Sequence, residues 1–121
     1  MKPNMYFLNS KSLIIDAIAC IEYNKSRCVI VVNSANKVIG VLSEGDIIRL
    51  LLNKVNLNSP LKNVINKSFK YFNNDQKIDD NIVFDLFLNG VTLIPVINNE
   101  RELVDIIISS DFLKKSNHLK L

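Results

Sequence analysis

Apolar residues change their spacing along the chain in an order that predicts helices and strands. They recur at helical spacing over residues 12–25, which predicts an amphipathic helix with Ser12 as its N-cap. Residues 28–32 and 38–42 are short β-branched runs on either side of a polar turn, a pattern typical of a hairpin with both strands largely buried. Residues 46–53 are apolar on nearly every side, which predicts a helix buried against a second surface.

The second half of the chain repeats this order after a shift of 65 residues. Residues 29–33 then lie on residues 94–98, and Asp46 lies on Asp111. Few residues are identical, but apolar positions coincide in most places, as expected of a tandem duplication. The segments predicted for the second half are a helix near 78–87, strands at 92–97 and 103–108, and a helix from Asp111.

Between the halves, residues 56–74 are polar and are predicted to form a connector with one short helix near residues 61–65. A unit of about 40 residues with two or three strands cannot bury its sheet alone, so the halves are expected to pack sheet on sheet with helices outside. The predicted fold class is α+β, with two α-β-β-α repeats related by pseudo-two-fold symmetry. Residues 1–58 form the first repeat, and residues 59–121 form the connector and the second repeat.

Length and charge narrow the functional classes. The 121 residues suffice for one compact module, and the net charge of +3 is too small and too scattered to indicate nucleic-acid binding. Cys20 and Cys28 fit neither a disulfide framework nor a zinc site, and are expected to be core residues of a cytoplasmic protein. No apolar run has the length of a signal sequence or membrane span, so a soluble protein without membrane contact is predicted.

The passage from the second predicted strand into the next helix reads Gly-Val-Leu-Ser-Glu-Gly-Asp, from Gly40 to Asp46. With the duplicated α-β-β-α units, it resembles the CBS (cystathionine-β-synthase) domain pair, or Bateman module. That family's pattern is Gly, two apolar or variable residues, Ser or Thr, two variable residues and Asp. The resemblance covers residues 8–115. Residues 43–49 and 60–66 are further similar to the CBS pair that precedes bacterial sugar-1-phosphate nucleotidyltransferase domains.

The resemblance implies a module that binds an adenine nucleotide, such as AMP or ATP, and needs no metal or other cofactor. At the positions that match the family motif, Asp46 would hold the ribose hydroxyls and Ser43 would reach ribose or phosphate. Residues 27–30 would line the pocket for the base. An ionised carboxylate can accept both hydroxyls of a diol, and backbone N–H groups at a helix start favour anions. The nucleotide-binding residues implied in this way are Arg27, Cys28, Ile30, Gly40, Ser43, Asp46 and, in the second half, Asp111.

A second interpretation of the same residues stays open. Ser43 followed by Asp46 is also a capping box, in which each side chain satisfies backbone N–H groups at the start of a helix. In the second half, Asp105 replaces Gly40 and Ile108 replaces Ser43, so the second nucleotide site is predicted to be weak or lost. Asp111 alone could be either a cap or a vestigial ribose contact.

The sequence contains no motif for catalysis, metal binding or nucleotide hydrolysis. His118 is the one histidine, so no catalytic triad or two-histidine metal site can be assembled, and no phosphate-binding P-loop or dinucleotide motif occurs. We therefore predict a non-catalytic regulatory module that controls an attached or partner enzyme and forms a homodimer through its apolar helices. The alternative is a dimerisation scaffold with a degenerate, ligand-free cleft, in which Ser43 and Asp46 only cap a helix.

Overall fold

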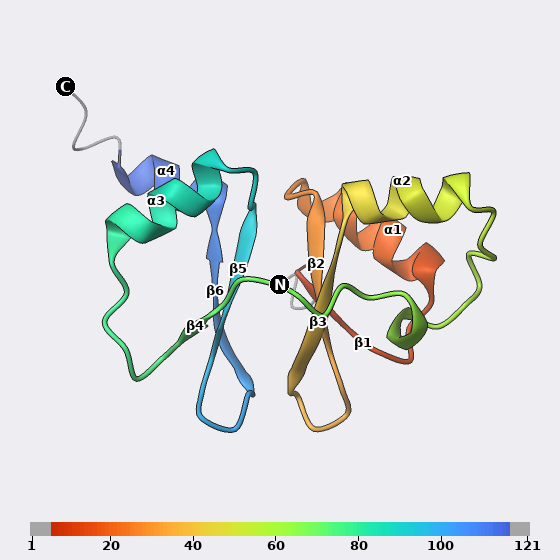
Figure 1. Cartoon of the computed structure of the whole chain (residues 1–121), viewed down its shortest axis with the longest axis horizontal. Helices are drawn as coiled ribbons and strands as arrows, with labels where there is room; N and C mark the ends of the chain where they lie inside the picture. Colours follow the sequence, from red (N-terminus) through yellow and green to blue (C-terminus); the bar gives the residue numbers. More distant parts are fainter. Residues whose placement is uncertain (1–5, 117–121) are drawn as a thin grey trace.

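The computed structural model describes residues 6–116, which form two similar halves (Figure 1). In chain order the elements are β1 (Phe7–Asn9), α1 (Ile14–Asn24), β2 (Cys28–Val32), β3 (Val38–Ser43), α2 (Glu44–Leu52), the 3₁₀ turn η1 (Leu61–Asn63), β4 (Phe72–Asn73), α3 (Asp80–Leu88), β5 (Leu93–Ile97), β6 (Leu103–Ile108) and α4 (Ser109–Ser116). Sheet β1-β2-β3 faces sheet β4-β5-β6, and each carries its two helices on the outer side. The α+β prediction is confirmed.

Strand register confirms the duplication. In the first hairpin Cys28 pairs with Ser43, and in the second Leu93 pairs with Ile108, which preserves the 65-residue shift found in the sequence. The same irregularity follows in both hairpins, between Val31 and Val32 and at the matching position of β5. Equivalent residues therefore occupy equivalent places in the two sheets.

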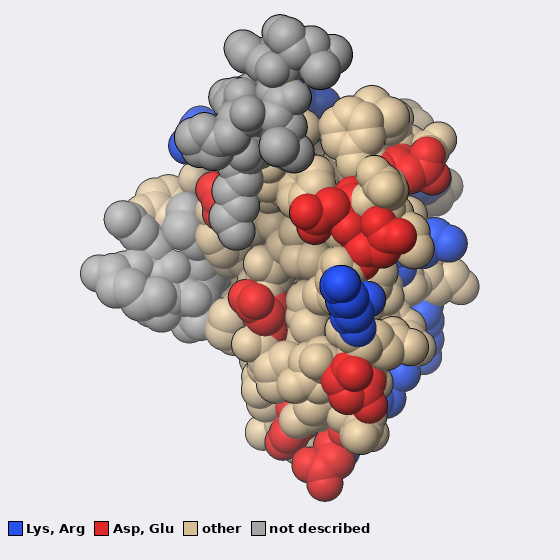
Figure 2. Space-filling view, turned by 90° about the vertical axis from the view of Figure 1, so that its left-hand side faces the viewer, with Lys and Arg blue, Asp and Glu red and all other residues tan. Residues whose placement is uncertain are grey.

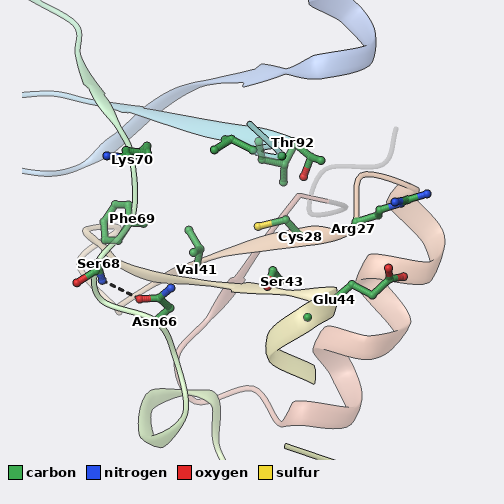
Figure 3. A pocket seen from close by; sticks show the side chains of 14 residues that line it. Arg27, Cys28, Val41, Ser43, Glu44, Asn66, Ser68, Phe69, Lys70 and Thr92 are labelled. Atoms are coloured by element: carbon green, nitrogen blue, oxygen red, sulfur yellow. Dashed lines mark hydrogen bonds between the residues drawn. The ribbon is translucent and has the colours of Figure 1, made fainter. Parts of the chain in front are cut away.

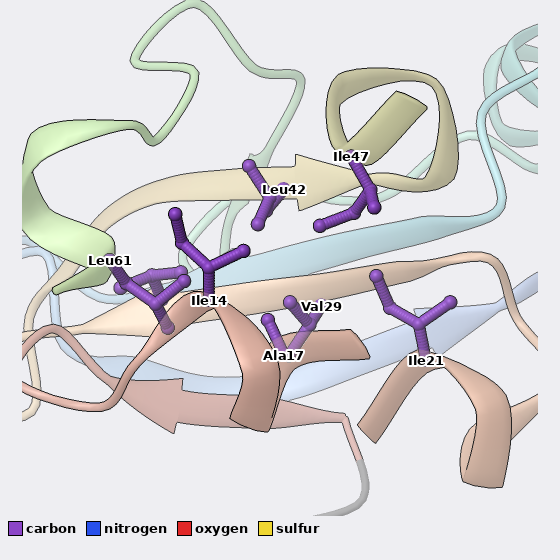
Figure 4. Packing of buried hydrophobic residues seen from close by; sticks show 8 residues of the cluster. Ile14, Ala17, Ile21, Val29, Leu42, Ile47 and Leu61 are labelled. Atoms are coloured by element: carbon purple, nitrogen blue, oxygen red, sulfur yellow. The ribbon is translucent and has the colours of Figure 1, made fainter. Parts of the chain in front are cut away.

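Strand β2 is buried along its whole length because both of its faces are covered. Val29 and Val31 face the helices of the first repeat, whereas Ile30 and Val32 face the opposite sheet. Figure 4 shows the helix-side core, whose buried members include Ile14, Ala17, Ile21, Val29, Leu42, Ile47 and Leu61. This double burial explains why β2 has an unbroken apolar sequence.

The structure also departs from the sequence prediction in the segments that precede α1 and α3. Strands β1 and β4 were not predicted, because two or three residues are too few to show alternation; each pairs in parallel with the central strand of its sheet. The predicted Ser12 cap is wrong. Helix α1 begins at Ile14, and the Leu13 N–H donates to the Asp16 carboxylate over 2.9 Å.

The burial predicted for α2 is wrong as well. Only Ile47 of this helix is buried. Leu51 and Leu52 leave 51% and 75% of their surface exposed, so one apolar side of α2 has no partner within the described residues. Within residues 6–116, no helix has both the length and the apolar character needed to span a membrane.

Candidate functional site

A cavity of about 500 Å³ lies between the two repeats. Its walls come from three segments: the start of β2 with the β3–α2 junction, the connector residues 66–70, and the loop 90–93 that leads into β5. Figure 3 shows Phe69 and Lys70 of the connector at one end, and Arg27 and Glu44 at the other. Because both repeats and the connector supply walls, a molecule in this cavity would contact all three.

The predicted site residues divide into two groups. Arg27, Cys28 and Ser43 line the cavity, whereas Ile30, Gly40, Asp46 and Asp111 are not among its lining residues. Ile30 is fully buried in the core between the sheets, and Asp111 is exposed in the first turn of α4. The structure thus brings together the residues at the start of β2 and the end of β3, but not the whole predicted set.

The connector packs so closely against Gly40 that a larger residue would not fit there. A Cβ atom at this position would lie 2.8 Å from the carbonyl oxygen of Asn66 and 3.0 Å from the side chain of Ile65. Beside it, Val41 and Asn66 exchange two backbone hydrogen bonds of 3.0 and 2.9 Å. Residues 65–66 therefore occupy the space beside Gly40, and this contact holds the connector against β3 where the connector enters the cavity wall.

Ser43 and Asp46 form a capping box at the start of α2. One carboxylate oxygen of Asp46, Oδ2, accepts hydrogen bonds from the Ser43 N–H and hydroxyl, each over 2.9 Å. The Ser43 Oγ in turn accepts from the Asp46 N–H over 3.1 Å. The other oxygen, Oδ1, accepts from Arg49 over 2.7 Å. Ser43 caps the helix and lines the cavity at once, while Asp46, its hydrogen-bond partner, is not among the lining residues.

Two titratable groups near the cavity have shifted pKa values. Burial alone would raise the pKa of Asp46, but hydrogen bonds from Ser43 and Arg49 outweigh it, so this pKa lies below its ordinary value. Burial, followed by the nearby negative charge of Asp46, raises the pKa of the Cys28 thiol to about 12. At neutral pH the site therefore presents an ionised Asp46 and an uncharged Cys28.

Several lining residues were missed by the sequence analysis. Asn66, Ser68, Phe69 and Lys70 were predicted only as connector, because nothing local indicates that this segment crosses back over β3. Thr92 could have been found, since it is the 65-residue counterpart of Arg27. The duplication predicts that both residues precede the central strands of facing sheets, and both do line the cavity.

Charge around the cavity is mixed, with Arg27 and Lys70 as cations and Glu44 as an anion. The outer face of the second repeat is mixed as well. Figure 2 shows acidic side chains there with basic side chains beside them, and Asp79, Asp80 and Asp85 of the α3 region are exposed. Within residues 6–116 no His, Cys, Asp and Glu side chains gather as a metal site would require, and His118 lies outside these residues.

Comparison with known proteins identifies the fold. Residues 1–53 match the model of the CBS domain family. The second sheet repeats the first in topology and register, so both halves share one architecture. This chain folds as a CBS domain pair. The pair shares 29% identity over 114 residues with the uncharacterized protein MJ1225 of Methanocaldococcus jannaschii, covering 94% of this chain but 40% of the relative. The chain thus spans less than half the length of this curated relative.

Two solved structures that contain CBS domains share the fold at low sequence identity. The protein PAE2072 from Pyrobaculum aerophilum, complexed with AMP, superposes with a TM-score of 0.70 at 17% identity, over 98% of this chain and 95% of that one. The CBS domain pair of protein MJ0100, in complex with 5′-methylthioadenosine and S-adenosyl-L-methionine, gives a TM-score of 0.74 at 16% identity, over 95% and 90% of the two chains.

Proposed function

We propose that this CBS pair is a non-catalytic regulatory module that binds an adenine nucleotide, such as AMP or ATP, in the cavity between its repeats. The observation that carries the proposal is the cavity itself, whose volume of about 500 Å³ falls within the usual range of ligand sites, roughly 300–1,000 Å³. The structures of PAE2072 with AMP and of MJ0100 with adenosyl compounds support an adenosyl ligand.

The lining residues have chemistry that suits such a ligand. Val41, Phe69 and Leu93 supply apolar surface for a purine ring. Arg27 and Lys70, at opposite ends of the cavity, each supply positive charge for a phosphate, and the uncharged thiol of Cys28 repels a phosphate at neither end. We assign the ribose to the end of the cavity next to Ser43, where the hydroxyl lies beside the start of α2.

Asp46 does not itself line the cavity, but it is hydrogen-bonded to Ser43, which does, and we propose that it reaches the ribose through the oxygen that Ser43 does not use. Its Oδ2 is engaged in capping, but its Oδ1 is held by Arg49, whose side chain is 67% exposed. An ion pair with so exposed a partner contributes only about 0–1 kcal/mol, so a ribose diol can take its place. Asp46 would then cap the helix through one oxygen and hold the sugar through the other.

We further propose that the pair binds one nucleotide and not two. At the matching positions of the second repeat, Ile108 offers no hydroxyl and Asp105 adds a negative charge. Asp111 is exposed in α4, where it lacks a serine partner of the kind that Asp46 has. The second repeat then serves the first site by supplying one wall through residues 90–93.

Regulation would follow from the position of the cavity. A ligand that contacts both repeats favours one relative orientation of them, and this bias is passed to an attached or partner enzyme. A sugar-1-phosphate nucleotidyltransferase remains our prediction for that enzyme, on the sequence similarity of residues 43–49 and 60–66.

A melting experiment tests the nucleotide proposal. AMP, ATP, S-adenosylmethionine and, as the control base, GMP are each added at 1 mM. A ligand with a dissociation constant near 10 μM should stabilise the fold by about 2.7 kcal/mol, which raises the midpoint by several degrees. Ser43→Ala should abolish the shift, and Ser43→Thr, which keeps the hydroxyl, should retain it. The proposal fails if no adenosyl compound raises the midpoint, or if GMP does so equally.

The exposed apolar side of α2 favours a second function, a dimerisation scaffold. Ile48, Leu51 and Leu52 leave half or more of their surface exposed on a single helix, and burying such a face requires a partner. We propose that a second copy of the chain is that partner. A chain that dimerises while no adenosyl compound alters its melting would act as a scaffold alone.

A further inference from the structure

The two hairpin ends are joined by a short pair of hydrogen bonds, which we call the clasp. The Val38 N–H donates to the Arg101 carbonyl over 2.9 Å, and the Leu103 N–H donates to the Asn36 carbonyl over 3.1 Å. Lys37 and Glu102 therefore face each other as an antiparallel bridge. Among the described residues, the hydrogen bonds that link the first repeat to β5, β6 and their turn all lie at this end.

The clasp contains the pseudo-two-fold axis of the molecule. Lys37 and Glu102 are counterparts under the 65-residue shift, and so are the two hydrogen bonds beside them. Asn36 and Arg101, which supply the accepting carbonyls, are also counterparts, and both have left-handed backbones with φ of 63° and 66°. At such an axis, a repeat that paired with its own copy would place the same side chain opposite itself.

The side chains at this axis carry opposite charges and are held by their surroundings. The Lys37 ammonium donates to the Glu100 carbonyl over 2.9 Å. The Glu102 carboxylate accepts from the Asn98 amide over 2.8 Å. The hydrogen bond of the Glu102 carboxylate is partly buried and that of the Lys37 ammonium is exposed, so solvent and salt screen the Glu102 charge less than the Lys37 charge.

We propose that Lys37 and Glu102 select the partner across the axis, so that a first repeat accepts a second repeat and rejects another first repeat. A pair of first repeats would place Lys37 against Lys37, and a pair of second repeats would place Glu102 against Glu102. Like charges directly opposite each other in paired strands are destabilising, whereas opposite charges are favourable. The hairpin end of a first repeat is therefore complementary in charge to that of a second repeat. This inference does not depend on nucleotide binding.

Charge reversal in the full chain tests this selection. Lys37→Glu and Glu102→Lys each place like charges at the axis, and each should lower the melting midpoint by roughly 2–6 °C at low salt. The effect should shrink at 1 M salt, where the Debye length is about 3 Å. The double variant, with both charges exchanged, should melt above either single variant.

Two controls separate charge from other effects. Lys11→Glu makes the same change of net charge at an exposed position that takes no part in the clasp hydrogen bonds, and should leave the midpoint within about 1 °C. Lys37→Gln removes the charge without creating repulsion, so it should cost less than Lys37→Glu. The proposal is overturned if Lys37→Glu melts like Lys11→Glu or Lys37→Gln, or if the double variant shows the full sum of the two single losses.

Discussion

Gly40 connects one residue to the shape of the whole site. Because an added Cβ atom would lie 2.8 Å from the Asn66 carbonyl oxygen, Gly40→Ala must push the connector away from β3. We predict a loss of about 1–3 kcal/mol in the free energy of unfolding, the usual cost of overpacking. Urea denaturation measures it directly.

Gly45 is the matched control for this substitution. A Cβ atom there would meet nothing closer than 3.7 Å, and Gly45 lies within α2, where alanine is favoured over glycine by about 1 kcal/mol. Gly45→Ala should therefore leave stability unchanged or raise it. Equal losses for the two variants would show that crowding by the connector is not what requires Gly40.

Asp46 gives the stability of the fold a predictable dependence on pH. Its pKa is lower in the folded chain than its ordinary value of 3.8, so its ionised form stabilises the fold fully above about pH 4. That contribution disappears as the pH falls through the lowered value. Asp46→Asn should cost about 1 kcal/mol at pH 7, a typical value for a cap, and the difference from the parent chain should shrink as the pH falls below the ordinary pKa of 3.8. Denaturant unfolding across this range tests it, and a constant difference would contradict the assignment.

For residues 43–46 the sequence predicted a capping box, but it could not decide whether Ser43 and Asp46 only cap α2 or also bind a nucleotide. The spacing of Ser43 and Asp46 suffices for a capping box, and the structure shows one. Whether the same atoms also hold a ligand depends on what lies across the cavity. Phe69 and Thr92 stand there, brought from distant parts of the chain.

Among the elements, α2 has an exposed apolar side that no described residue covers. Leu52 exposes 75% of its surface, so Leu52→Glu should leave the folded monomer intact but weaken association of two copies by about tenfold or more. Sedimentation equilibrium over a range of concentrations measures the change. Val104→Glu, at a residue that is 48% exposed on β6, is the control and should not alter association. Equal association of the parent chain and Leu52→Glu would exclude α2 from the interface.

Element prediction succeeded where the cause was local. β2 and β6 were placed to the residue because β-branched runs meet turn residues at both hairpins. β1 and β4 could not be predicted, since their only signal is pairing with a distant strand. The burial of α2 was misjudged because an apolar helix looks the same whether its partner belongs to its own chain or to another.

For the whole molecule, duplication explains both the fold and the site. Each repeat buries one face of its sheet under its own helices and the other against its counterpart, and the clasp joins them at the hairpin end. At the opposite end of the strands the two sheets enclose the cavity. The central claim is that an adenosyl ligand occupies this space and contacts both repeats.

Titration calorimetry of the parent chain and a cavity-filling variant tests that claim most directly. Val91 lines the cavity from the second repeat, so Val91→Trp fills the space without altering Ser43 or Asp46. AMP and S-adenosylmethionine are titrated in turn. We predict that at least one binds the parent chain with one ligand per chain, and that Val91→Trp, still folded, binds neither. No heat of binding with either ligand, or equal binding by the variant, would contradict the account.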